Sequence, residues 1–150
     1  MGYIKNLRKL VGSKPLIVCG CGCLIFNEKS EVLLQKRNDD NSWGTPGGSM
    51  ELGESMYDTV IREVKEETGL DVEELELFNI YSGESQHYFY PNGDETYIVN
   101  ILFKSNKYSG NLKSNKESRE LKFFKIEDIP ENIHKPFKPV LIDLKDKNNS

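Results

Sequence analysis

A run of charged residues near the middle of the chain has the types and spacing to do chemistry. Residues 62–67 read Arg-Glu-Val-Lys-Glu-Glu. On a helix, at about 100° per residue, Glu63, Glu66 and Glu67 fall within an arc of about 100°. Carboxylates at this spacing repel one another, and the macrodipole disfavours them near a helix C-terminus. Most such clusters are solvated faces, but a hard divalent cation such as Mg²⁺ would also remove the conflict, because it takes oxygen ligands.

A glycine-rich segment leads into this helix. Residues 43–48 read Trp-Gly-Thr-Pro-Gly-Gly. Gly47 and Gly48 allow the backbone to come close to a ligand or to present a carbonyl to a metal. A plain tight turn would use the same residues. The segment therefore supports a binding site only in combination with the acidic run that follows it.

The acidic run lies in the best-defined helix of the sequence. Ser55, followed by Asp58 three residues later, resembles a capping box, and Gly69 suits the C-terminal cap. These signals predict a helix over residues 55–68. The stripe that we expect this helix to bury consists of Tyr57, Val60, Ile61 and Val64.

The remaining elements are mainly strands. Alternation and composition predict strands over residues 15–26, 31–35, 72–81, 85–90, 95–103 and 121–126. Helices are expected over 3–11 and 137–144, loops over 38–49 and 106–118, and a frayed tail over 145–150. The first two strands should form a hairpin, and residues 91–94 (Pro-Asn-Gly-Asp) should turn the chain between the fourth and fifth. Without a linker or repeat, this order predicts one α+β domain over residues 1–150.

Composition limits the classes of function. The 150 residues carry a net charge of −4, with 37% hydrophobic and 29% charged residues, which suits one folded domain. The acidic balance argues against nucleic acid as a partner. No apolar run approaches the roughly 20 residues of a membrane span, so we expect a cytoplasmic protein. Cys19, Cys21 and Cys23 lack the second pair of a zinc site and are expected as reduced thiols in or near the core.

The segment from Gly48 to Leu70 reads GSMELGESMYDTVIREVKEETGL and resembles the Nudix box, the sequence motif of the Nudix hydrolases. The motif combines a glycine, five residues, a glutamate, seven residues, and then Arg-Glu-aliphatic-any-Glu-Glu-any-Gly-aliphatic. Its fixed positions are filled by Gly48, Glu54, Arg62, Glu63, Val64, Glu66, Glu67, Gly69 and Leu70. The resemblance implies an α/β/α sandwich with a mixed β-sheet, in which the box forms a loop, a helix and a second loop.

The resemblance also implies a metal site within the box. Glu66 and Glu67 should ligate Mg²⁺, for which Mn²⁺ can substitute. Glu63 should lie close by as a further ligand or as the proton acceptor. The Gly48 carbonyl is a frequent additional ligand in the family.

Two further residues of the box complete the implied catalytic set. Arg62 should orient the glutamates through hydrogen bonds and ion pairs, and Glu54 should steady the loop or touch the metal through water. Family members differ in which carboxylate accepts a proton from the attacking water. Glu63 is the first choice here, and Glu117 and Glu120 are second choices that ordinary surface charge would also explain.

Substrate contacts are expected outside the box. Arg37 follows a predicted strand and is expected to meet substrate phosphate, although a solvated role would suit it equally. Tyr88 lies 18 residues after Leu70, where dinucleoside polyphosphate hydrolases often have a tyrosine. We expect Tyr88 to contact substrate, with a place in the core or sheet as the alternative.

The resemblance implies hydrolysis of a phosphoanhydride bond in a nucleoside diphosphate derivative. Among small-molecule substrates we favour a nucleoside triphosphate or related nucleotide. Dinucleoside polyphosphates and nucleotide sugars, including ADP-ribose, are the alternatives. A non-catalytic nucleotide sensor is the rival class, against which the complete carboxylate set argues. A homodimer that uses the N-terminal helix is compatible with the sequence.

Overall fold

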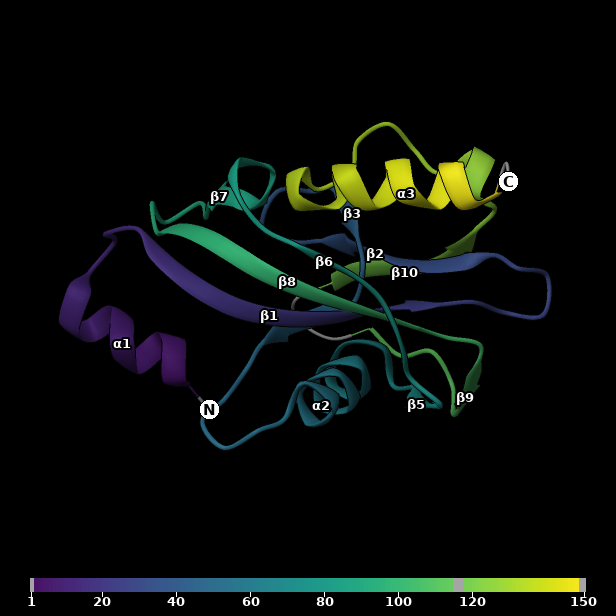
Figure 1. Ribbon diagram of the computed structural model, residues 1–150, viewed down its shortest axis with the longest axis horizontal. Helices are drawn as coiled ribbons and strands as arrows, with labels where there is room; N and C mark the ends of the chain where they lie inside the picture. Colours follow the sequence, from purple (N-terminus) through teal and green to yellow (C-terminus); the bar gives the residue numbers. More distant parts are fainter. Residues whose placement is uncertain (1, 115–117, 149–150) are drawn as a thin grey trace.

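The computed structural model of the chain describes residues 2–114 and 118–148. Its elements run from one end of the chain to the other as strands interrupted by three α-helices (Figure 1). They are α1 (Tyr3–Val11), β1 (Leu16–Ile25), β2 (Val32–Arg37), β3 (Trp43–Gly44), β4 (Gly47–Ser49), α2 (Met56–Thr68), β5 (Asp71–Glu73), β6 (Glu76–Tyr81), β7 (His87–Phe89), β8 (Glu95–Ser105), β9 (Lys107–Ser109), β10 (Ser118–Phe124) and α3 (Lys138–Asn148).

The larger sheet is mixed, as the resemblance implied. Its strand order is β4-β1-β8-β6, and β7 also pairs with β8. The pairing of β1 with β8 is parallel, from Leu16 opposite Thr96 to Ile25 opposite Ser105, and the other pairs are antiparallel. A second sheet has the order β10-β2-β3, and β5 pairs with β9. The antiparallel pairing of β1 with β4 places the middle of β1 beside Gly48, where the box begins.

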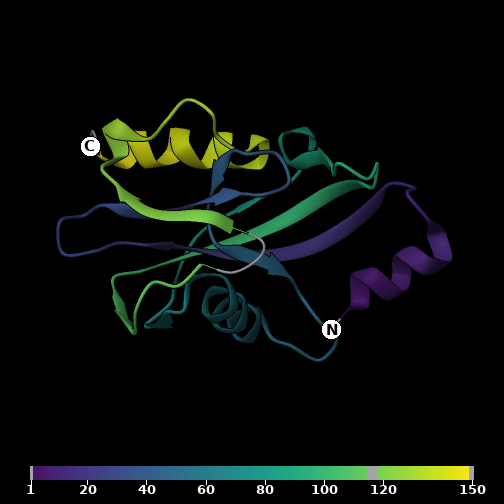
Figure 2. The ribbon, with the colours of Figure 1, turned by 180° about the vertical axis from the view of Figure 1, so that it is seen from behind.

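Helices cover the sheets from two sides, with α3 on one side and α2 on the other (Figures 1 and 2). One core cluster packs beneath α3, and a second packs beneath α2. The first includes Leu24, Leu34, Trp43, Leu102, Phe137 and Val140. The second includes Cys23, Ile25, Leu33, Val60, Val64 and Phe103. Two apolar cores flanked by helices make the α/β/α sandwich that was expected.

The helix α2 begins and ends where the local chemistry predicts. The Ser55 hydroxyl accepts a hydrogen bond from the Asp58 N–H, the Asp58 carboxylate accepts one from the Ser55 N–H, and Gly69 closes the helix in the left-handed region. Val60 and Val64 are fully buried, and each contributes about 2 kcal/mol by leaving water.

The prediction that Tyr57 and Ile61 are buried is wrong. Tyr57 and Ile61 are 52% and 44% exposed, whereas Thr59, Glu67 and Thr68 are buried. The helix is therefore rotated so that one of its carboxylates faces inward.

Short pairings account for most departures from the predicted elements. The loop over residues 38–49 contains β3 and β4, and the loop over 106–118 contains β9. The strand over 72–81 is divided at Glu74, which adopts a φ of 51°, so β5 and β6 join different partners. The predicted hairpin of β1 and β2 is reduced to one bridge between Phe26 and Val32, because the two strands then enter different sheets.

The structure also tests the predictions for the terminal helices, for the segment before β7 and for the cysteines. The helix over residues 3–11 is confirmed, and the last helix continues to Asn148 where a frayed tail was expected. Residues 84–86 form a 3₁₀ turn before β7. All three cysteines are free, Cys19 exposed and the other two buried. Among the described residues, no helix is long and apolar enough to cross a bilayer.

Candidate functional site

Arg62 lies at the centre of the acidic face of α2. Its guanidinium donates to both oxygens of Glu54 at 2.6 and 2.8 Å, to Glu63 at 2.7 Å and to the Ser49 carbonyl at 3.2 Å. Glu66, at 3.4 Å, is a weaker partner whose side chain is 45% exposed. The hydrogen bonds from Arg62 lower the pKa of Glu54 from 4.5 to about 2. One arginine therefore holds together the loop and the helix of the box.

The backbone at Gly48 forms a cradle for the Glu63 carboxylate. A Cβ atom added at this glycine would lie 2.5 and 2.6 Å from the two carboxylate oxygens, closer than side chains pack. Gly48 also pairs with Cys21 of β1, which fixes the position of its backbone. A larger side chain at this position would displace the carboxylate, so the glycine lets Glu63 lie against the backbone.

Glu67 points into the protein from the same helix. Its side chain is nearly buried, and it accepts hydrogen bonds from the Gly47 N–H at 2.8 Å and from Gln35 Nε2 at 3.2 Å. The other polar atom of Gln35, Oε1, is buried and has no hydrogen-bond partner among the residues that the structure describes. Buried acceptors without a partner are rare in folded proteins. The Gln35 Oε1 atom can therefore accept a hydrogen bond beside the carboxylates.

This donor set fits a hard divalent cation. Three carboxylates and the backbone oxygen of Gly48 are the oxygen ligands that Mg²⁺ takes, and the Gln35 oxygen can receive a hydrogen bond from a water that completes the shell. Within the described part of the chain, no three His, Cys, Asp or Glu side chains already converge in a metal-binding arrangement. Ion pairs with Arg62 and hydrogen bonds from Gly47 and Gln35 hold the carboxylates instead, so metal binding would exchange some of these contacts.

A cavity of about 660 Å³ opens over this face of α2. All three glutamates line it, together with Arg62 and Gln35. The other walls come from β2 and the loop after it, from β4, and from the start of α1. The arrangement places a charged surface against a volume large enough for a phosphate chain.

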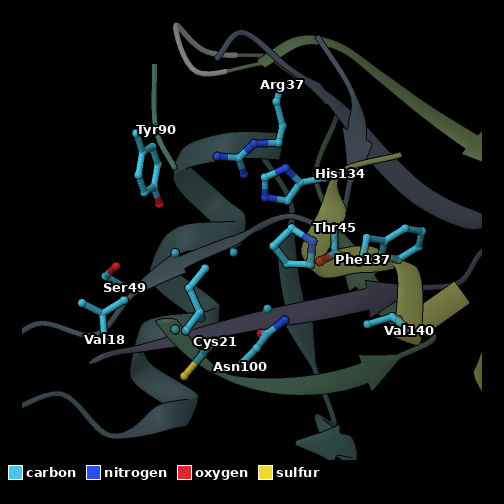
Figure 3. A pocket seen from close by; sticks show the side chains of 16 residues that line it. Val18, Cys21, Arg37, Thr45, Ser49, Tyr90, Asn100, His134, Phe137 and Val140 are labelled. Atoms are coloured by element: carbon cyan, nitrogen blue, oxygen red, sulfur yellow. The ribbon is translucent and has the colours of Figure 1, made fainter. Parts of the chain in front are cut away.

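A second cavity of about 110 Å³ adjoins the first. The two share wall residues Arg37, Gly47, Gly48, Ser49 and Tyr90. Apolar side chains line much of the second cavity, among them Val18, Ile98, Phe137 and Val140. Figure 3 shows the Tyr90 ring across from Arg37 and His134, with Asn100 and Cys21 below them. The smaller cavity therefore offers stacking and apolar contact beside the acidic surface of the larger one.

The structure brings Arg37 to the shared wall, where its guanidinium forms a two-point ion pair with Asp39 at 2.7 and 2.9 Å. Burial would lower the pKa of Arg37, but the hydrogen bonds and charge of Asp39 outweigh burial and raise it. Arg37 therefore stays charged at the point where the two cavities meet.

The structure places Tyr88 in the sheet, which was the alternative to substrate contact. It is 9% exposed, and its hydroxyl donates to Asp40 at 3.0 Å. The Asp40 carboxylate also contacts His134 Nδ1 at 2.8 Å. Tyr90 packs edge-on against Tyr88 and presents its own ring to both cavities. Tyr88 thus supports the wall, and Tyr90 forms its surface.

Comparison with known proteins shows which family shares this sequence and fold. A family model described as the NUDIX domain matches residues 19–144. The chain belongs to the Nudix family. This Nudix chain is 31% identical over 109 residues to the ADP-ribose pyrophosphatase of Methanocaldococcus jannaschii. The aligned region covers 71% of this chain and 61% of that protein. It is 28% identical over 134 residues to a MutT-like protein of Streptomyces ambofaciens, with 89% and 80% covered.

A solved structure shows the same fold. The MutT NUDIX hydrolase from Burkholderia pseudomallei matches with a TM-score of 0.71 and 23% identity, over 85% of this chain and 97% of that one. The predicted α+β Nudix fold is therefore confirmed.

The Nudix box is brought together as a unit, because Arg62 contacts both Glu54 and Glu63. The alternative proton acceptors lie elsewhere. Glu120 is exposed on β10 opposite Lys36, and Glu117 is outside the described residues. Sequence reasoning missed His134, Asn100 and the other wall residues that come from distant elements. No local pattern identifies these, since only the fold assembles them.

Proposed function

We propose that this Nudix protein hydrolyses a phosphoanhydride bond in a nucleoside diphosphate derivative, with a nucleoside triphosphate or related nucleotide as substrate. The observation that carries the proposal is the shared wall of the two cavities. It sets a compartment lined by the Tyr90 ring and by both polar and apolar side chains directly beside a surface of three carboxylates. The base of a nucleotide can stack against Tyr90 in the first, and a metal-bound phosphate chain fits the second.

Glu66 and Glu67 are the residues that would hold Mg²⁺, with the Gly48 carbonyl as a further ligand and Glu63 close by. Bound there, the metal would neutralise phosphate oxygens and lower the pKa of water so that a nucleophile exists near neutral pH. Glu63 would accept a proton from the attacking water, because its carboxylate is held in place by Arg62 and by the Gly48 cradle. Arg62 itself keeps Glu63 oriented and ties it to Glu54.

Arg37 and Tyr90, in the wall that the two cavities share, orient the substrate. The Arg37 guanidinium is charged and faces both cavities, so it can bind a phosphate oxygen where the nucleoside meets the phosphate chain. The Tyr90 ring provides a stacking surface for the base. These two contacts hold the scissile bond over α2.

ADP-ribose is the second candidate substrate. The relative from M. jannaschii is named an ADP-ribose pyrophosphatase, and ADP-ribose shares the nucleoside diphosphate part with the favoured substrate. The nucleoside compartment would accept either molecule. The group beyond the second phosphate distinguishes them, and it would lie over the far end of the larger cavity.

A panel of nucleotides with and without Mg²⁺ tests the proposal. We expect metal-dependent release of a nucleoside monophosphate or diphosphate from at least one nucleoside polyphosphate. Glu66→Gln should lower turnover by about 100-fold or more without loss of the fold, because one metal ligand is removed. The matched control is Glu76→Gln on β6, whose side chain is 74% exposed and lies outside both cavities. Equal turnover by Glu66→Gln and the wild type would refute the metal assignment, and no turnover of any nucleotide would favour the sensor.

A further inference from the structure

The N-terminal helix contributes to the larger cavity. Gly2, Ile4 and Lys5 line it together with the carboxylates of α2, although residues 12–55 separate the two helices in the sequence. The family match begins at residue 19, so α1 lies outside the matched range. It therefore supplies wall residues that the Nudix box does not.

Polar contacts hold α1 at both ends. At its start, the Tyr3 N–H donates to a carboxylate oxygen of Glu51 at 3.0 Å, and Glu51 lines the same cavity. At its end, the Arg8 guanidinium donates to the carbonyls of Gly12, Lys14 and Glu95 at 2.9, 2.5 and 2.7 Å. No residue of α1 is fully buried, so these contacts fix its place beside the loop before α2 (Figure 1).

The charges around the cavity single out one residue of α1. Three cationic side chains among the described residues line it, and two of them also form ion pairs within the protein: Arg62 with the glutamates of the box, and Arg37 with Asp39. The third is Lys5. In the part of the chain that the structure describes, no hydrogen bond or ion pair holds its ammonium group. An uncommitted cation at the rim of an acidic cavity is available to an anionic substrate.

We propose that Lys5 binds the phosphate chain of the substrate at the end remote from the nucleoside, and so selects nucleoside triphosphates over nucleotide sugars. The proposal rests on the function proposed above. Arg37 lies at the junction with the nucleoside compartment, whereas Lys5 lines only the larger cavity. A phosphate that extends from one towards the other meets a positive charge there. A neutral sugar in the same place gains nothing from an ammonium group.

Lys5→Ala tests this contact, with Lys9→Ala as the matched control. Lys9 lies one turn further along the same helix, is exposed and does not line the cavity. The measurement is kcat and KM for a nucleoside triphosphate and for a nucleotide sugar with the same base. We expect Lys5→Ala to raise the KM of the triphosphate about tenfold, with kcat and the KM of the sugar unchanged. Lys5→Arg should restore most of the loss, and Lys9→Ala should match the wild type.

Two results would overturn the assignment. An equal rise in KM for both substrates would mean that Lys5 acts only as a general counter-charge, and unchanged values for both would mean that it makes no contact. Titration calorimetry with a non-hydrolysable triphosphate and Mg²⁺ separates this proposal from the proposed function. Tight binding that Lys5→Ala weakens about tenfold, without turnover by the wild type, would support Lys5 and refute the hydrolase. Absence of binding by the wild type would refute both.

Discussion

Replacement of Gly48 by alanine tests the positioning of Glu63 without removing any functional group. The added Cβ would lie 2.5 and 2.6 Å from the carboxylate oxygens, where ordinary contact begins at 3.4 Å. The carboxylate must therefore move by about 1 Å, a displacement that can cost about 100-fold in rate. The φ of Gly48 is not in the positive range, so the backbone accepts alanine. Stability should fall by no more than about 1 kcal/mol, through loss of the partly exposed pair of Arg62 and Glu63.

The matched control is Gly53→Ala, in the loop that leads to α2. Gly53 has a φ of 84°, and a Cβ there would meet nothing within 4 Å. We expect this variant to lose about 1 kcal/mol of stability from backbone strain, with little change in kcat. Steady-state kinetics at saturating Mg²⁺ and denaturant unfolding give the two readouts. If Gly48→Ala keeps full activity, or if Gly53→Ala loses as much, the cradle does not position the base.

Three further predictions follow from the contacts. Arg62→Ala should return the pKa of Glu54 towards 4.5 from about 2. A carboxylate whose pKa is lower in the folded than in the unfolded protein stabilises the fold at pH values above its unfolded pKa. The wild type should therefore exceed the variant in unfolding free energy by the full amount above pH 4.5, and this difference should vanish as the pH falls to about 2. An advantage that does not depend on pH would contradict this origin. Tyr90→Ala should raise KM about tenfold with kcat unchanged, whereas Phe89→Ala, which alters a half-exposed ring on the neighbouring strand, should not; equal KM values for the two variants would remove the stacking role. Ser55→Ala should cost about 1 kcal/mol in chemical unfolding through loss of the cap of α2, and a neutral effect would show that the cap is redundant.

The sequence predicts those features that depend on local chemistry. The caps of α2 at Ser55 and Gly69 were readable because each satisfies backbone groups within a few residues. The acidic face of the helix followed from the period of 3.6 residues. The Nudix box was recognisable because its residues contact one another within a single loop and helix.

The features that were missed depend on contacts between distant segments. Glu67 turns inward, in place of Ile61, because Gly47 and Gln35 offer it hydrogen bonds from two strands. Tyr88 was favoured over Tyr90 because the spacing along the chain cannot show which ring faces a cavity. The place of Lys5 at the cavity depends on how α1 folds back onto the loop before α2, and no local pattern indicates that.

The central claim is that the glutamates of α2 hold a divalent ion over which the phosphate chain lies. Crystals grown with Mn²⁺ and a non-hydrolysable nucleotide test it most directly through anomalous scattering. The account predicts an anomalous peak within about 2.3 Å of carboxylate oxygens from Glu66 and Glu67, in contact with a phosphate oxygen of the nucleotide. A nucleotide bound in the cavity with no metal at these carboxylates, or with the metal at another site, would contradict it.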